Sequence, residues 1–265
     1  LLAPLLDERD GAVSGEVWAV EASPAARAAL AQILPPPRVV DTMGALPRSL
    51  HGVVIANELL DNLPVALASR RQDGWAELRV TVSGDTLALT PVPPRPHVAA
   101  WAVRYGGASP VGGQVEVEQA AAEWVTAMVG RLTAGTLVVV DYGGTSGELA
   151  HRRAEGTLRT YRGHHLGPDP LLEPGATDVT VDVDFTAMRD AAEAAGATVT
   201  VLRQDDFLTE WGLREAVDAL RAREAECARA GDTIGQLRAR DERIGAETLL
   251  HPRGLGDFRV LLARV

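Results

Sequence analysis

Residues 56–64, ANELLDNLP, contain the highest density of side chains that could take part in catalysis or ligand binding. They place Asn57, Glu58, Asp61 and Asn62 directly after an apolar run, and they contain both asparagines of the sequence. A carboxylate can hold a cation or accept a proton, and an amide offers both a donor and an acceptor, which suits an adenine edge or a guanidinium. The segment therefore predicts a binding or catalytic site. The alternative is an asparagine that caps or turns a helix start, and it is favoured for Asn62 more than for Asn57.

Three further acids follow short apolar runs: Glu21 after VWAV, Asp41 after RVV and Asp141 after TLVVV. In open α/β sheets, ligands bind beyond the carboxyl ends of the strands. An acid at the end of an early strand can accept hydrogen bonds from a ribose diol. For Glu21 alone, an interaction with the dipole of the following helix is an equal alternative.

The elements that must position these residues are short apolar strands alternating with helices. The helix after Glu21 is predicted to begin at Ser23 as N-cap, with Pro24 in its first turn, and to stop at PPP (35–37). This alternation indicates an α/β fold with a mostly parallel sheet and helices on both faces. The strands are expected in residues 16–21, 38–41, 52–58, 136–143, 197–204 and 257–265.

Three stretches break this alternation. Residues 65–96 alternate apolar and polar positions around turns at DG and SGD, which predicts a small antiparallel insertion. Residues 143–183 are rich in Gly, Pro, His and Asp with little periodicity, and we expect a long functional loop on the substrate side. Residues 213–244 are charged and rich in Ala and Arg, which is typical of a solvated helical pair broken at Gly231 and Gly235.

Composition sets outer bounds on function. The chain has 265 residues, 26 basic and 36 acidic, and a net charge of −10, so it has no basic face for nucleic acid. All the basic residues are arginine, a bias that a GC-rich bacterial genome explains. Cys227 is the one cysteine, which fits a reducing cytoplasm without disulfides and predicts no metal site. The opening LLAPLL is too short for a signal-peptide core, nothing in the sequence is long enough to span a membrane, and a single domain over residues 1–265 is expected.

Seven segments in this order resemble the MidA family, class I S-adenosylmethionine-dependent methyltransferases whose mitochondrial members assist respiratory complex I assembly. The resemblance spans nearly the whole chain. The segments are VEASPAAR (20–27), ANELLDNLPV with its strand, VVVDYG (138–143), EGTLRTYRGHH (155–165), DPLLEPGATDVTVDVDFTAM (169–188), QDDFLTEWGL (204–213) and LLHPRGLGDFRVL (249–261).

The resemblance implies a seven-stranded methyltransferase sheet, S-adenosyl-L-methionine as cofactor and, as in the mitochondrial members, a protein arginine as methyl acceptor. It also assigns roles by matching position. The implied cofactor residues are Glu21, Ala22, Asp41, Thr42, Asn57 and Glu58; the catalytic residues are Glu58, Asp61 and Glu116, the last an acid just before a helix; the substrate-side residues are Asp141, Tyr142, Arg159 and Tyr161.

One feature of the family pattern has no match. The family places a glycine-rich turn after its first strand, where the backbone approaches the methionine part of the cofactor. Only some fifteen residues precede the segment matched to the second strand, and they contain no such turn. We therefore expect that the first strand and its turn are absent, because the chain is a fragment or a natural truncation.

Methyl transfer from a sulfonium is an in-line displacement, so catalysis needs positioning and exclusion of water. A guanidinium acceptor would be held by carboxylates, and Glu58 and Glu116 are the best candidates. A small-molecule hydroxyl acceptor would instead use a general base, with His164 or His165 as candidates. Two alternatives therefore stay open: a methyltransferase for small metabolites, and a non-catalytic assembly protein that keeps the fold. A homodimer is also possible.

The three phenylalanines all fall inside matched segments, but packing alone could require them. Phe207 and Phe258 are expected in the core. Phe185 is expected to begin a helix that packs on the sheet.

Overall fold

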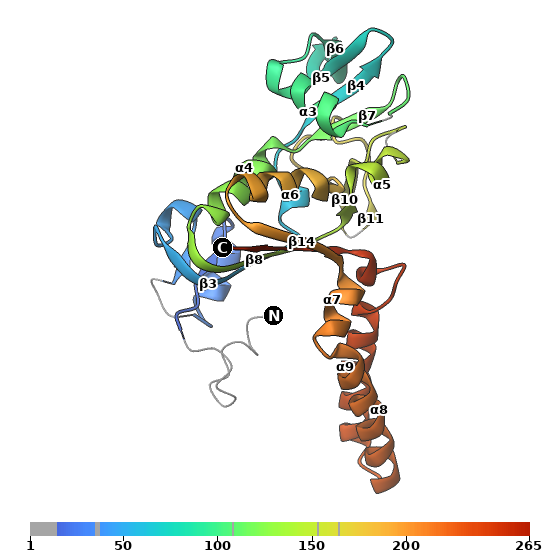
Figure 1. Ribbon diagram of the computed structural model, residues 1–265. Helices are drawn as coiled ribbons and strands as arrows, with labels where there is room; N and C mark the ends of the chain where they lie inside the picture. The colour runs from blue at the N-terminus through green and yellow to red at the C-terminus, as the bar shows by residue number, and fades with distance from the viewer. Residues whose placement is uncertain (1–14, 35–37, 108, 153, 164) are drawn as a thin grey trace. The chain divides into compact units, whose positions relative to one another are not determined.

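A computed structural model describes residues 15–265 except 35–37, 108, 153 and 164 (Figure 1). The chain divides into two compact units, residues 1–50 and 51–265. The opening LLAPLL and the PPP stop lie outside the described residues, as does His164.

The first unit contains one βαβ element. Strands β1 (Ala19–Val20) and β2 (Val39–Val40) pair in parallel and are connected through helix α2 (Pro24–Leu30). The prediction for the helix start is confirmed: Ser23 is the N-cap and its side chain accepts from the Ala26 N–H. Since both strands run in the same direction, the residues that follow them, Glu21 and Asp41, lie at the same edge.

The second unit is built on a four-stranded sheet of order β14-β15-β8-β3. Two contacts show that β3 and β8 run in the same direction: Gly52 lies against Gly135 near the start of both, and the Glu58 N–H bonds Val140 O at 2.9 Å near their ends. The sheet consists of β3 (Leu50–Asn57), β8 (Leu132–Asp141), β14 (Thr198–Arg203) and β15 (Arg259–Arg264).

The expectation of a mostly parallel sheet is met only in part in this unit: β3, β8 and β14 run in one direction, whereas β15 is antiparallel to both β14 and β8. The physical reason is the connection between β14 and β15. The chain leaves the carboxyl end of β14 through α7 (Gln204–Glu210), and the Gln204 N–H bonds Phe258 O at 2.8 Å where it re-enters the sheet. It therefore returns at the same edge and must run back in the opposite direction.

Helices α4 (Gln119–Val129) and α6 (Phe185–Ala194) pack against each other over one face of this sheet (Figure 1). Phe185 is 1 % exposed and begins α6, as predicted. Val53 and Ile55 of β3, in contrast, are 66 % and 59 % exposed, so no helix in the described part of the second unit covers these two side chains. The core beneath the helices includes Val125, Met128, Leu137, Val139, Met188 and Leu261.

The predicted antiparallel insertion is present and larger than expected. Turns at the predicted DG and SGD positions join β4 (Ala66–Arg71), β5 (Gly74–Ser83) and β6 (Thr86–Val92). After α3 (Pro96–Tyr105), strand β7 (Gln114–Val117) pairs with β4 and completes the order β6-β5-β4-β7. We call this element the small sheet.

Residues 143–183 are not the irregular loop that the sequence suggested. They contain a three-stranded antiparallel sheet of order β11-β10-β12, which escaped the periodicity because each strand is only two to four residues long. The elements are β9 (Gly143–Gly144), α5 (Ser146–Ala150), β10 (Arg159–Arg162), β11 (His165–Leu166), β12 (Asp178–Thr180) and β13 (Val183–Asp184).

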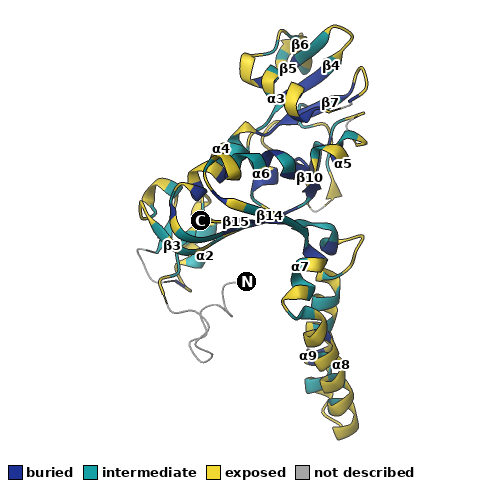
Figure 2. Ribbon diagram, viewed as in Figure 1, coloured by how far each residue is buried: buried dark blue, intermediate teal, exposed yellow. Residues whose placement is uncertain are grey.

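The charged region forms the expected helical pair, α8 (Leu213–Ala230) and α9 (Thr233–Leu249). Gly231 ends α8 in a left-handed conformation, φ 72°, but Gly235 lies inside α9 and breaks nothing. The two helices pack chiefly against each other, and their surface is largely exposed (Figure 2). Among the residues that the structure describes, no helix is both long and apolar enough to cross a membrane.

Candidate active site

The turn that follows β3 carries a strained residue. Glu58 has φ 48°, and in the described part of the chain it is the one non-glycine residue with positive φ. Its N–H is fixed by Val140 O, its side chain is exposed, and Asn57 Nδ2 donates to its carboxylate at 3.3 Å. A left-handed glutamate persists only where the surroundings hold it, and such strain gathers at functional sites.

Asp141, the last residue of β8, fixes this turn by accepting hydrogen bonds from its backbone. Its Oδ2 accepts the backbone N–H groups of Leu59, Leu60 and Asp61 at 3.2, 3.0 and 3.4 Å, and its Oδ1 accepts that of Tyr142 at 3.0 Å. Burial raises the pKa of Asp141 to about 7, with a further contribution from the nearby Asp61 charge. Asp141 was predicted to contact substrate; instead it is fully buried and holds the backbone of the turn.

Asp61 is the acceptor at the centre of a polar cluster above this turn. Its Oδ2 accepts the Thr180 hydroxyl at 2.7 Å and the Tyr142 hydroxyl, and its Oδ1 accepts Asn62 Nδ2 at 2.7 Å. Burial and then the hydrogen bond to Asp61 raise the pKa of Tyr142, so the phenol stays protonated and donates. Asp61, predicted as catalytic, is thus a buried anion with its position fixed by three side chains.

Arg159 brings a positive charge that is already neutralised. Its guanidinium lies 5.4 Å from the centre of the Tyr142 ring and pairs with Asp182, which also binds Arg152 at 2.8 Å. Asp182 is 3 % exposed. The charge of Arg159 is balanced by that of Asp182. Arg159 therefore contributes to the cavity chiefly through its stacking on the Tyr142 ring.

These groups surround a cavity of about 440 Å³. Three carboxylates, Glu58, Asp61 and Asp178, face the single cation Arg159, so the cavity favours a cationic ligand held among aromatic rings. The sequence-predicted residues that the structure brings together here are Glu58, Asp61, Tyr142, Arg159 and Tyr161. The full lining is Glu58, Asp61, Asn62, Tyr142, Arg159, Tyr161, Asp178, Thr180 and Phe258.

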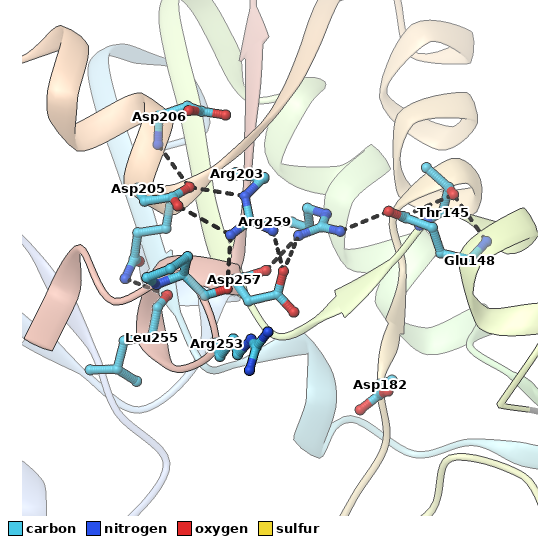
Figure 3. A network of polar contacts seen from close by, with 12 residues as sticks. Thr145, Glu148, Asp182, Arg203, Asp205, Asp206, Arg253, Leu255, Asp257 and Arg259 are labelled. Atoms are coloured by element: carbon cyan, nitrogen blue, oxygen red, sulfur yellow. Dashed lines mark hydrogen bonds and ion pairs between the residues drawn. The ribbon is translucent and has the colours of Figure 1, made fainter.

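Phe258 was expected in the core, but it is half-buried and lines the cavity, where its ring lies 5.6 Å from that of Tyr142, edge to face. A polar network fixes the backbone on both sides of Phe258 (Figure 3). Arg203 pairs with Asp257, and Arg259 binds Asp257 at 3.2 Å and Glu148 of α5 at 2.9 Å. Phe207, the other expected core phenylalanine, is also half-buried.

The sequence interpretation missed Asp178, Thr180 and Phe258 as lining residues. Asp178 and Thr180 sit at alternate positions of β12, so the polar–apolar alternation of DVT was the available signal. For Phe258 the sequence offered no signal, because its place depends on the direction of the last strand. An antiparallel β15 places its first residue, Arg259, opposite Asp141, at the edge where the site lies.

Glu116 lies outside this cavity. It is 2 % exposed on β7, does not line the cavity, and accepts the backbone N–H groups of Thr157 and Leu158 at 2.6 and 3.2 Å. The predicted pairing of Glu58 with Glu116 around one guanidinium is therefore not formed. Glu116 instead fixes the chain just before β10, the strand that carries Arg159 and Tyr161.

The remaining predicted cofactor residues belong to the first unit. Glu21 Oε1 accepts the Ser23 N–H at 2.7 Å, and Oε2 has no hydrogen-bond partner among the described residues. The carbonyl of Ala22 is bound by Arg27 at 2.6 Å. Asp41 and Thr42 are exposed after β2, and Thr42 makes no side-chain cap bond to the following turn.

His165 is exposed in β11, and the described residues contain no cluster of three or more His, Cys, Asp and Glu that could hold a metal ion.

Comparison with known proteins adds family and fold. A family profile described as "Putative S-adenosyl-L-methionine-dependent methyltransferase" matches residues 6–203. The mitochondrial protein arginine methyltransferase NDUFAF7 of mouse is 27% identical over 215 residues, which cover 78% of this chain and 44% of the relative. The human protein of that name is 27% identical over 224 residues, 79% of this chain and 46% of the relative. This chain thus spans less than half the length of these two relatives.

Two crystal structures of Burkholderia thailandensis proteins share the fold. One, solved with S-adenosyl-homocysteine bound, has a TM-score of 0.79 and 28% identity and covers 97% of this chain and 66% of that chain. The other, a native structure, also has a TM-score of 0.79, with 29% identity and coverage of 97% and 68%.

Proposed function

Because this chain belongs to a family of S-adenosyl-L-methionine-dependent methyltransferases, we propose that it transfers a methyl group to the guanidinium of a protein arginine. The observation that carries the proposal is the cavity, in which Glu58, Asp61 and Asp178 surround a space walled by Tyr142 and Tyr161. Carboxylates pair with the planar guanidinium in a bidentate manner, and aromatic faces attract its charge. The mouse and human relatives are named protein arginine methyltransferases, which supports the same acceptor.

The residues of the first unit fit the ribose and adenine parts of S-adenosylmethionine. Among the described residues, one carboxylate oxygen of Glu21 has no hydrogen-bond partner, which suits a ribose diol, and Asp41 and Thr42 at the neighbouring strand end suit an adenine edge. In the second unit, Asn57 ends β3 and Glu58 follows it, and both are proposed as cofactor residues by their match to the family segment. The parallel pairs β1–β2 and β3–β8 support a class I methyltransferase sheet.

S-adenosylmethionine, when bound, supplies a methyl carbon on a sulfonium that departs as a neutral sulfide. The chain's own part is to place the acceptor nitrogen. Asp61, fixed by Tyr142, Thr180 and Asn62, provides a rigid anion, whereas Glu58 is exposed and can move with the acceptor. We propose that Glu58 aligns the nitrogen and receives the proton that it loses when the C–N bond forms. Phe258 and Tyr142 exclude water from the cavity.

We also propose that the protein acts in the cytoplasm, on the grounds of its single cysteine, Cys227, which is free. A homodimer remains a prediction. Cell fractionation followed by light scattering of the purified protein tests both.

Two measurements test the function. Calorimetric titration with S-adenosyl-homocysteine should give saturable binding at one site. Methyl-labelled S-adenosylmethionine, incubated with the protein and either cell protein or a small-molecule extract, should label arginine in the protein fraction. Label confined to the small-molecule extract would instead identify a metabolite methyltransferase. Absence of both binding and label would leave a non-catalytic assembly protein.

A further inference from the structure

The three short strands β11, β10 and β12 form one wall of the cavity, and their register defines a row of side chains across it. Tyr161 of β10 is paired with Leu166 of β11 on one side and with Asp178 of β12 on the other. Residues opposite each other on neighbouring strands project to the same face. Since Tyr161 and Asp178 line the cavity, Leu166 must lie on the same face, one strand beyond Tyr161.

This row continues the cavity outward. Leu166 is 77 % exposed and does not line the cavity itself, so it forms an apolar rim beside the Tyr161 ring. Asp178, also exposed, forms an acidic rim on the other side. The charge of the face is set by carboxylates, because Arg159 is paired with Asp182. The face therefore suits a ligand that is cationic and carries an aliphatic group.

Strand spacing sets the size of that ligand. Neighbouring strands lie about 4.8 Å apart, so the row from Asp178 to Leu166 spans roughly 10 Å, and Leu166 is about 5 Å from the cavity wall at Tyr161. An extended peptide advances about 3.3 Å per residue. A peptide whose arginine enters the cavity beside Tyr161 would thus bring a side chain one or two residues away onto Leu166.

We propose that Leu166, Tyr161 and Asp178 form a subsite for residues that flank the acceptor arginine of a polypeptide. Leu166 with Tyr161 receives an aliphatic side chain, and Asp178 receives a second basic one. The proposal rests on the proposed function for the identity of the acceptor, but the binding of such a peptide does not require turnover. The occupant is a basic segment of a protein with an aliphatic residue near its arginine.

Fluorescence anisotropy with synthetic peptides tests the Leu166 part. Each peptide carries one central arginine in an alanine and glycine background, with leucine or serine one or two positions to either side. The wild-type protein should bind at least one leucine peptide about five- to tenfold more tightly than its serine counterpart. Leu166→Ser should abolish that preference. Leu172→Ser is the matched control, because Leu172 is 69 % exposed in the same segment but belongs to no strand.

A second peptide pair tests Asp178. Replacing one alanine by a second arginine should strengthen binding to the wild type by about two- to fivefold at low salt, and Asp178→Asn should remove that gain. Asp85→Asn, an exposed acid in the turn between β5 and β6, should leave it unchanged.

The outcomes of these experiments distinguish failure of the proposed subsite from failure of the proposed methyl transfer. A leucine preference that survives Leu166→Ser, or no peptide binding to the wild type, overturns the subsite whatever the enzyme methylates. A preference that is lost in Leu166→Ser without any methylation supports the row as a peptide surface and counts against the reaction. Where peptides are methylated, Leu166→Ser should raise KM for the leucine peptide about five- to tenfold and leave kcat unchanged.

Discussion

The carboxylate of Asp141 accepts the backbone N–H of Leu60 at 3.0 Å, although the two residues are 81 positions apart in the sequence. The same carboxylate oxygen accepts the N–H groups on both sides of Leu60, so one buried carboxyl group accepts from three successive donors of a single turn. This arrangement places Glu58 at the mouth of the cavity and Asp61 inside it. It links the two strands on which the proposed chemistry depends.

Asp141→Asn should change how stability depends on pH. The folded-state pKa of Asp141 is about 7, above its ordinary 3.8, so the native protein binds the additional proton between these values and loses stability as pH rises through this window. Asparagine does not titrate. The free energy of unfolding of the wild type, relative to that of Asp141→Asn, should fall by up to about 3 kcal/mol between pH 5 and pH 8.

Urea denaturation of both proteins at these two pH values measures the difference, and the other titrating groups cancel because both proteins contain them. A difference that stays constant, or that grows with pH, would show that Asp141 ionises normally in the fold.

Glu58→Gln should abolish methyl transfer, because an amide cannot receive the proton or match the charge of a guanidinium. The affinity for S-adenosyl-homocysteine should stay within roughly tenfold of wild type, about 1.4 kcal/mol. Turnover assays and calorimetry give the two numbers. Glu155→Gln, an exposed acid before β10, is the matched control and should behave as wild type. Normal turnover in Glu58→Gln would remove Glu58 from the catalytic residues.

Two substitutions of Glu116 distinguish positioning from catalysis. Glutamine keeps an acceptor oxygen for the Thr157 N–H, so Glu116→Gln should retain turnover within a few-fold. Alanine leaves two buried N–H groups without an acceptor, and Glu116→Ala should lower the free energy of unfolding by about 1 to 3 kcal/mol. Steady-state kinetics and urea denaturation provide the readouts. If Glu116→Gln were as inactive as Glu58→Gln, the catalytic role suggested by the family resemblance would be restored.

Glu77 anchors the small sheet through Arg79 at 2.8 Å and through the backbone N–H of Arg95 at 3.0 Å. Its burial raises its pKa, but the hydrogen bonds from Arg95 and Arg79 outweigh burial and lower it to about 2. Glu77→Gln should therefore cost about 1 to 3 kcal/mol at pH 7. Because the folded pKa is depressed, this difference should shrink as pH falls from about 4.5 towards 2.

Denaturation of wild type and Glu77→Gln at pH 7 and pH 3.5 shows the trend, with Asp85→Asn as a control that should change neither value. A cost that is larger in acid would mean that the carboxylate is not the stabilising form.

Part of the site could be predicted because its residues are local in sequence. The turn at 57–62 stood out by its rare asparagines and by its place after an apolar strand, and the structure puts Glu58, Asp61 and Asn62 at one cavity. The role of Asp141 could not be found in this way. An acid at a strand end looks the same in sequence whether it faces a ligand or accepts N–H groups from a neighbouring turn.

The fold, like the site, combines features that the local sequence predicts with features that it does not predict. The turns at DG and SGD and the cap at Ser23 follow from local chemistry and are confirmed. The direction of β15 and the pairing of β7 with β4 depend on contacts between segments far apart in the chain, which periodicity does not report. The strands of two to four residues in 143–183 are held by such distant partners more than by their own propensity.

The helical pair α8–α9 is stabilised mainly by contacts between its own two helices, unlike the rest of its unit. Val217 and Ala239 are its fully buried side chains, and its helices contact little besides each other, α7 and the turn at Leu255–Asp257. Few buried contacts to the sheet mean that little is lost elsewhere when the pair opens. We expect it to behave as a separate cooperative folding unit, whose amide hydrogens exchange and whose arginines become cleavable by trypsin while the amides of β8 and β15 are still protected.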